Sequence, residues 1–145
     1  DTTLFASPDT VRSVMERTDL FLVDLKHMDS GSHCRFTGVP NERILSNLRM
    51  IAEAGIDFLI RIPLIEGVNA DEENISRSAI FLASLPWARK VVNLLPYHDI
   101  GKGKHDKRGT LYNPGHLPLS TPSEAVLQRC IDQFASCGIT ALIGG

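Results

Sequence analysis

The chain has 145 residues, of which 43% are hydrophobic and 22% charged, and its formal net charge is −2 at pH 7. This composition predicts a single globular domain over residues 1–145 and excludes a disordered or low-complexity chain. Without a basic excess we expect no binding to nucleic acid or an anionic membrane, and without a long apolar run or signal peptide we expect a cytoplasmic protein.

The first part of the chain alternates amphipathic segments with short apolar runs. Ser7, followed by proline, predicts the start of a first helix. Residues 20–26 are apolar on both faces until the run ends, which is typical of a parallel strand covered on each side. We expect a loop over residues 27–40. Asn41 then predicts the N-cap of a helix that ends at Gly55 in a left-handed conformation.

The remaining predicted elements continue this alternation. In chain order they are a strand over 57–62 stopped by Pro63, a helix from Glu72 up to Pro86, a strand from Val91, an irregular segment over 96–120, a helix opened by the capping box Thr121–Glu124, and a strand over 139–143. Strands separated by single helices imply an α/β fold with parallel pairing and right-handed crossovers. Four strands in sequential order favour part of a (βα) barrel over a doubly wound sheet, although periodicity alone does not choose between them.

Charged residues at the predicted strand ends are the candidate site, because sheets built from βα units bind ligands outside the carboxyl ends of their strands. Asp24 and Lys26 share one face of their strand and suit a zwitterionic ligand, and a plain ion pair between them is the alternative. Arg61, near the end of the next strand, suits a carboxylate or a salt bridge at the rim. His98, just past the third strand, is a candidate for ligand binding or is merely solvated.

The loop after His98 carries weaker motifs. Gly101-Lys102-Gly103-Lys104 has the composition of a phosphate-binding loop but lacks the GxxxxGK[ST] order that aims backbone N–H groups at phosphate. The polar residues of this region have neither helix nor strand spacing, so we predict no metal site. They are His98, Asp99, His105 and Asp106.

Five motifs carry a resemblance to a known family. They are Asp1-Thr2, residues 18–26 ending in Asp-Leu-Lys, Thr37-Gly-Val-Pro-Asn41, Ile60-Arg-Ile-Pro-Leu-Ile-Glu-Gly-Val-Asn69 and Leu94-Leu-Pro-Tyr-His98. In order and spacing, from end to end, the chain resembles the glycyl-radical-enzyme activating enzymes, the family of pyruvate formate-lyase activating enzyme. The resemblance implies a radical S-adenosylmethionine enzyme, an oxidoreductase, on a partial (βα)6 TIM-like barrel.

The resemblance also implies a chemistry and a set of site residues. In the family a four-iron, four-sulfur cluster reduces S-adenosylmethionine, and the 5′-deoxyadenosyl radical takes a hydrogen from a backbone glycine of a partner glycyl radical enzyme. Flavodoxin or ferredoxin would supply the electron. By matching motifs, Asp1, Asp24, Lys26, Arg61 and His98 would line the S-adenosylmethionine site.

Two family motifs are missing and one position differs. The sequence holds neither the CxxxCxxC cluster motif nor the Gly-Gly-Glu motif, and its cysteines, Cys34, Cys130 and Cys137, lack metal or disulfide spacing. We therefore expect the C-terminal portion of such an enzyme, with no cluster ligands and no activity alone. The last two cysteines are seven apart, which predicts one buried helix face. Leu4 stands where the family usually has glycine.

Two alternatives stay open at the level of sequence. One is a phosphate-binding (βα)-barrel lyase with Lys26 as Schiff-base nucleophile and Gly144-Gly145 near a substrate phosphate. The other is a non-catalytic domain that docks a partner protein.

Overall fold

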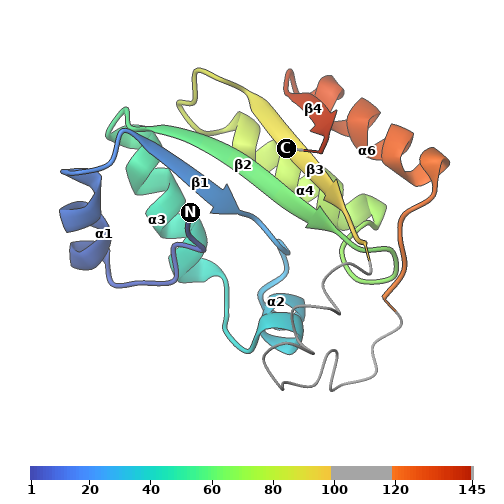
Figure 1. Ribbon diagram of the computed structural model, residues 1–145, viewed down its shortest axis with the longest axis horizontal. Coiled ribbons are helices and arrows are strands. Elements are labelled where there is room, and N and C mark those ends of the chain that lie inside the picture. The colour runs from blue at the N-terminus through green and yellow to red at the C-terminus, as the bar shows by residue number, and fades with distance from the viewer. Residues whose placement is uncertain (99–118, 145) are drawn as a thin grey trace.

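A computed structural model describes residues 1–98 and 119–144 (Figure 1). In chain order its elements are α1 (Pro8–Met15), β1 (Leu20–Asp24), α2 (Ser30–Thr37), α3 (Glu42–Glu53), β2 (Asp57–Leu64), α4 (Glu72–Ala83), β3 (Val91–Pro96), α6 (Glu124–Ser136) and β4 (Thr140–Ile143). Within these ranges no helix is both long enough and apolar enough to cross a bilayer. The Gly- and Lys-rich residues 101–104 and most of the predicted irregular segment lie outside the described residues.

The strands pair in the order in which they follow each other in the chain. The order is β1-β2-β3-β4, and every pair is parallel. Between consecutive strands the chain returns through helices, as sequential βα units require. The predicted α/β class with a sequential parallel sheet, part of a partial barrel, is confirmed. All carboxyl ends of the strands therefore lie along one edge of the sheet.

The two faces of the sheet differ in burial. Side chains such as Val23, Ile60 and Leu94 are fully buried, and α3 and α4 lie behind the strands on that side in Figure 1. The alternating residues on the other face, among them Asp24 and Arg61, are only partly buried. The expectation that β1 is covered on each side is wrong for the described part of the chain, where helices cover one face. An open inner face is what a partial barrel offers to a ligand.

Local signals predicted two helix ends correctly. Ser7 caps α1, because its hydroxyl accepts a hydrogen bond from the backbone N–H of Thr10 at 3.2 Å. Gly55 follows α3 with φ of +71°, a left-handed conformation that glycine adopts without steric penalty. In both places a short-range steric or hydrogen-bonding preference is enough to determine the backbone.

Two predicted caps differ in their side-chain bonds from what was expected. Asn41 is the N-cap of α3 as predicted, but its side chain makes no capping bond, and its amide donates to the carbonyl of His27 at 2.8 Å. The N-cap of α6 is Ser123 rather than Thr121, whose hydroxyl donates to the carbonyl of Tyr97 at 2.7 Å. In each case a tertiary partner uses the side chain that a local rule assigned to the helix end.

Two further boundaries differ from the prediction. The predicted loop over 27–40 contains α2, capped by Asp29 and ended by Gly38 at φ of +84°. Only His33 of this helix is buried, so the sequence shows no apolar stripe there. Pro63 does not stop β2, which continues to Leu64. β1 pairs with β2 only as far as Arg61, so the missing N–H of Pro63 interrupts no ladder to β1.

Candidate functional site

Arg61 joins two carboxylates at the carboxyl edge of the sheet. Asp24 and Arg61 are register partners. Nε of Arg61 donates to Oδ1 of Asp24 at 2.9 Å, and Nη2 forms an ion pair with the same oxygen at 2.7 Å. Nη2 also contacts a carboxylate oxygen of Asp1. The side chains of Arg61 and Asp24 are 24% and 22% exposed. We call Asp1, Asp24 and Arg61 the strand-end cluster, in which two carboxylates share one guanidinium.

The N-terminal segment places Asp1 in this cluster by pairing beside β1. The N–H of Thr2 donates to the carbonyl of Leu22 at 2.9 Å, and the N–H of Asp24 donates to the carbonyl of Thr2 at 3.3 Å. Leu4 then turns the chain away with φ of +59° while its side chain is only 2% exposed. Asp1 is therefore positioned by backbone pairing, followed by a turn in the left-handed region.

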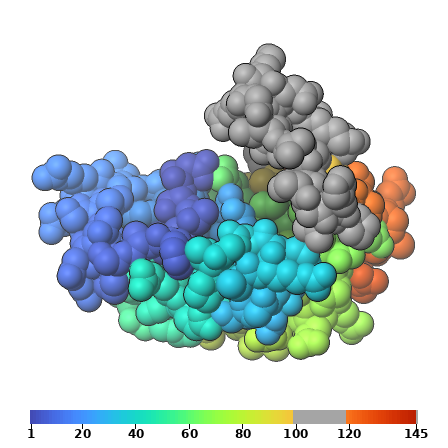
Figure 2. All heavy atoms as spheres, turned by 90° about the horizontal axis from the view of Figure 1, so that it is seen from below, coloured from blue at the N-terminus to red at the C-terminus, as the bar shows by residue number. Residues whose placement is uncertain are grey.

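Lys26 lines the hollow next to the strand-end cluster. The hollow has a volume of about 190 Å³, and its walls include Asp24, Lys26 and residues of α2. Thr3 and Phe5 of the N-terminal segment also line this hollow. Figure 2 draws that segment in dark blue and α2 in cyan. Among the described residues Lys26 has no ion-pair partner, so the alternative of an ion pair between Asp24 and Lys26 is wrong. Arg61 takes the carboxylate instead, as a salt bridge.

His98 lies at the same edge of the sheet. It is exposed, two residues beyond the end of β3, and β3 is the neighbour of β2, which carries Arg61. Asn93, which was not among the predicted site residues, is closer in register, because it pairs with Arg61 and is partly buried on the same face. Alternation between the apolar Val92 and Leu94 was the signal that could have found it.

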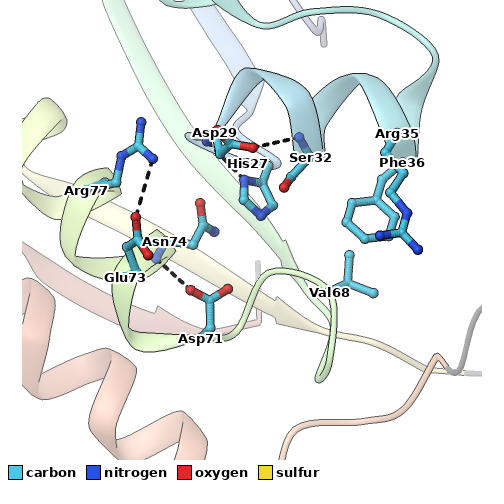
Figure 3. Close-up of a pocket in the computed structure, with 10 residues that line it drawn as sticks. All are labelled: His27, Asp29, Ser32, Arg35, Phe36, Val68, Asp71, Glu73, Asn74 and Arg77. Atoms are coloured by element: carbon cyan, nitrogen blue, oxygen red, sulfur yellow. Dashed lines mark hydrogen bonds and ion pairs between the residues drawn. The ribbon is translucent and has the colours of Figure 1, made fainter.

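A larger hollow lies elsewhere, where α2 and α4 begin (Figure 3). It has a volume of about 420 Å³. Asp29 and Asp71 cap these two helices, each accepting a backbone N–H from three residues further on, at 2.7 and 2.9 Å. Glu73 lies 3.7 Å from Arg77. The three carboxylates of this hollow therefore have partners within the chain, and none of the predicted site residues lines it.

His27 also lines that hollow and is shifted towards the neutral form. Burial lowers its pKa, and the nearby carboxylates of Asp71 and Asp29 raise it by less. A neutral ring agrees with its hydrogen bond, in which Nδ1 accepts the backbone N–H of Asp29 at 3.0 Å. His27 therefore acts as an acceptor that orders the loop after β1.

A solved structure identifies the family. It is described as a domain of pyruvate-formate lyase-activating enzyme from Bacteroides vulgatus, and it shares 50% sequence identity with the chain at a TM-score of 0.83. The similarity covers 100% of this chain and 79% of that structure. The chain belongs to the pyruvate-formate lyase-activating enzyme family.

Curated relatives place the chain among activating enzymes of glycyl radical enzymes. The trans-4-hydroxy-L-proline dehydratase activating enzyme of Clostridioides difficile is 39% identical over 145 residues, 100% of this chain and 47% of that protein. The choline trimethylamine-lyase activating enzyme of Oleidesulfovibrio alaskensis is 36% identical over 133 residues, 90% of this chain and 43% of that protein. The chain thus spans about half the length of these relatives. No protein-family model matches it.

The left-handed backbone conformation of Leu4 is at a position where the family usually has glycine. The resemblance places glycine at this position, and a φ of +59° is a conformation that glycine takes more readily than leucine. The N–H of Leu4 donates to the hydroxyl of Thr2 at 2.9 Å, and its carbonyl accepts from the amide of Asn47 at 2.9 Å. Leu4 therefore has a backbone conformation that would suit the glycine expected from the resemblance.

The cysteines do not form a cluster site in the described part of the chain. Cys34 is exposed on α2, whereas Cys130 is buried in α6 and burial raises the pKa of its thiol. Cys137 is the C-cap of α6 and is partly buried against the same core as Cys130, so the predicted shared buried face is confirmed in part. No group of three potential metal-ligating side chains occurs among the described residues. These residues do not fit an iron–sulfur cluster.

Proposed function

We propose that Asp1, Asp24, Lys26, Arg61 and His98 bind S-adenosylmethionine at the carboxyl ends of the strands. For the whole protein we propose formation of a glycyl radical on a partner glycyl radical enzyme. The observation that carries the proposal is the strand-end cluster, with Lys26 on the wall of the adjoining hollow. Family membership supports it, since relatives named as activating enzymes align with all or most of the chain.

The charges of the site match those of the ligand. S-adenosylmethionine carries an ammonium, a sulfonium and a carboxylate. The carboxylates of Asp1 and Asp24 suit its positive groups, and the ammonium of Lys26 suits its carboxylate. Arg61 holds both aspartates in one place, so the ligand meets a preorganised pair. When reduced, bound S-adenosylmethionine supplies the 5′-deoxyadenosyl radical; the residues of this chain bind and orient it.

The iron–sulfur cluster and the electron donor are part of the proposal for the whole protein. Because the cysteines of this chain do not fit a cluster, we propose that residues outside the chain hold it. The electron would come from flavodoxin or ferredoxin, and the location would be cytoplasmic. Reading the gene upstream of the codon for Asp1 tests this part, because a CxxxCxxC motif in the same frame is expected there.

Titration of the isotope-labelled chain with S-adenosylmethionine, followed by NMR, tests the binding site. We expect backbone signals around Asp24 and Lys26 to shift. Lys26→Met should weaken binding about tenfold or more, the usual effect of losing one hydrogen bond to a charged group. Lys90→Met is the matched control, since Lys90 is an exposed lysine that precedes β3 at the opposite edge of the sheet.

A second ligand separates recognition of the amino acid from recognition of the adenosyl part. 5′-Deoxyadenosine lacks the charged methionine moiety, so Lys26→Met and the unchanged chain should bind it equally. If S-adenosylmethionine shifts no signals at the strand ends, or if both lysine variants bind it alike, the proposed site is refuted.

A further inference from the structure

Three buried asparagines hold the backbone that follows β1. Asn41, Asn69 and Asn74 are each 3% exposed and come from the loop before α3, the turn after β2, and α4. Their side chains bond three consecutive residues: Asn69 holds the carbonyl of Lys26, Asn41 the carbonyl of His27 and Asn74 the N–H of Met28. We call these three asparagines the asparagine clamp.

Asn69 is the central member of the clamp. Its Nδ2 donates to the carbonyls of Lys26 at 2.9 Å and Pro63 at 2.7 Å, and its Oδ1 accepts the N–H of Ile65 at 2.8 Å. Both amide hydrogens and the amide oxygen are therefore used. Pro63 has no N–H to continue a ladder from β2 towards β1, and the Asn69 side chain joins the two strand ends at this level.

Asn74 connects the clamp into one unit. Its Nδ2 donates to the carbonyl of Asn69 at 2.8 Å, while its Oδ1 accepts the N–H of Met28 at 2.8 Å. Arg77, one turn further along α4, donates to the carbonyl of Met28 at 3.2 Å. The start of α4 and the turn before it thus hold the strand end from which Lys26 projects.

We infer that Asn69 is a positioning residue that, through the Lys26 carbonyl, directs the Lys26 side chain into the hollow beside Asp24. An asparagine is required because the amide must donate twice and accept once in a buried place, where an unpaired group is costly. This inference deepens the proposed function, because Lys26 is the residue proposed to receive the ligand carboxylate.

A ligand-free measurement tests the positioning itself. Lysine amines carrying isotope-labelled methyl groups give one NMR signal each, and Asn69→Ala should move the Lys26 signal to that of a solvated lysine. The Lys90 signal should stay unchanged. Trp87→Phe is the matched control variant, because it removes another buried donor to a strand carbonyl, from Nε1 to Phe58 at 3.1 Å, at the opposite end of β2.

A double-mutant cycle on S-adenosylmethionine binding tests the route through Lys26. Asn69→Ala should weaken binding about tenfold in the unchanged chain and less than about twofold in the Lys26→Met background, as expected for coupled residues. Equal losses in both backgrounds would mean that Asn69 acts only on stability and would overturn the inference.

The two proposals fail in distinguishable ways. A Lys26 signal that does not move in Asn69→Ala overturns the positioning role, whatever binds. If the Lys26 signal moves but the chain binds no S-adenosylmethionine, the positioning role is supported and the proposal that this site binds S-adenosylmethionine is refuted. Where Asn69→Ala does not fold, Asn74→Ala is measured in its place, with the same expected results at a smaller amplitude, because Asn69 keeps its own three bonds.

Discussion

Leu4 is expected to reverse the usual order of alanine and glycine substitutions. At a buried site with ordinary backbone, glycine destabilises more than alanine, because it adds conformational entropy to the unfolded chain. Leu4 has φ of +59° and is 2% exposed, so its backbone favours glycine while its side chain belongs to the core. Both substitutions remove the part of the leucine side chain beyond Cβ, and they differ in the Cβ methyl, in backbone strain and in the entropy of the unfolded chain.

Typical free energies for strain and chain entropy predict which of the two Leu4 variants is more stable. Truncating a buried leucine to alanine costs about 2–5 kcal/mol, and alanine at Leu4 keeps a left-handed conformation that costs roughly 1–2 kcal/mol. Glycine removes that strain but loses about 0.4–1 kcal/mol through the unfolded state. Leu4→Gly should therefore be more stable than Leu4→Ala by about 0.5–1 kcal/mol, although both are less stable than the unchanged chain.

Urea unfolding of four variants measures this difference. Leu48 is the matched control, because it is 0% exposed and lies in the middle of α3. There the glycine variant should be less stable than the alanine variant by about 1 kcal/mol, the ordinary helix value. Finding glycine less stable than alanine at both positions would refute the argument that the backbone at Leu4 is strained.

Two further predictions concern charge. Arg61→Met leaves the mostly buried Asp24 carboxylate without its donor and should lower the free energy of unfolding, measured in urea, by about 1–3 kcal/mol. Arg89→Met is the control, because Arg89 forms an exposed pair with Asp57, and it should lower the free energy of unfolding by less. Equal losses in the two variants would contradict this account. The pKa of His27 is lower in the folded chain than its ordinary value of 6.5, so the unfolded chain binds more protons and stability should fall as pH drops below that value. His27→Gln should flatten this acid-side fall in the melting temperature, and an unchanged pH profile would show that another group causes it.

The main elements and their order could be predicted from local patterns. The apolar runs that became β1 to β4 and the amphipathic segments that became α1, α3, α4 and α6 follow from burial with periods of two and 3.6 residues. Ser7 and Gly55 marked helix ends through steric and hydrogen-bonding preferences of single residues. α2 was missed because burial of His33 alone leaves no periodic signal.

The sequence located the candidate site but did not predict the contacts between its residues. Alternation put Asp24 and Lys26 on one face, and the family motifs added Asp1, Arg61 and His98. Whether Asp24 pairs with Lys26 or with Arg61 depends on the register between β1 and β2, which no local pattern contains. No local pattern shows the partner of Asn41 either: its amide donates a hydrogen bond to the carbonyl of His27 and makes no capping bond to the helix that follows.

The sequence by itself determined the class of fold, the family and the edge of the sheet where the site lies, because burial periodicity and motif order are written along the chain. Only the tertiary structure decided which charges meet and which asparagines hold the strand end. Those contacts join residues that are tens of positions apart, such as Lys26 and Asn69, and the folded chain alone brings their polar groups within hydrogen-bonding distance.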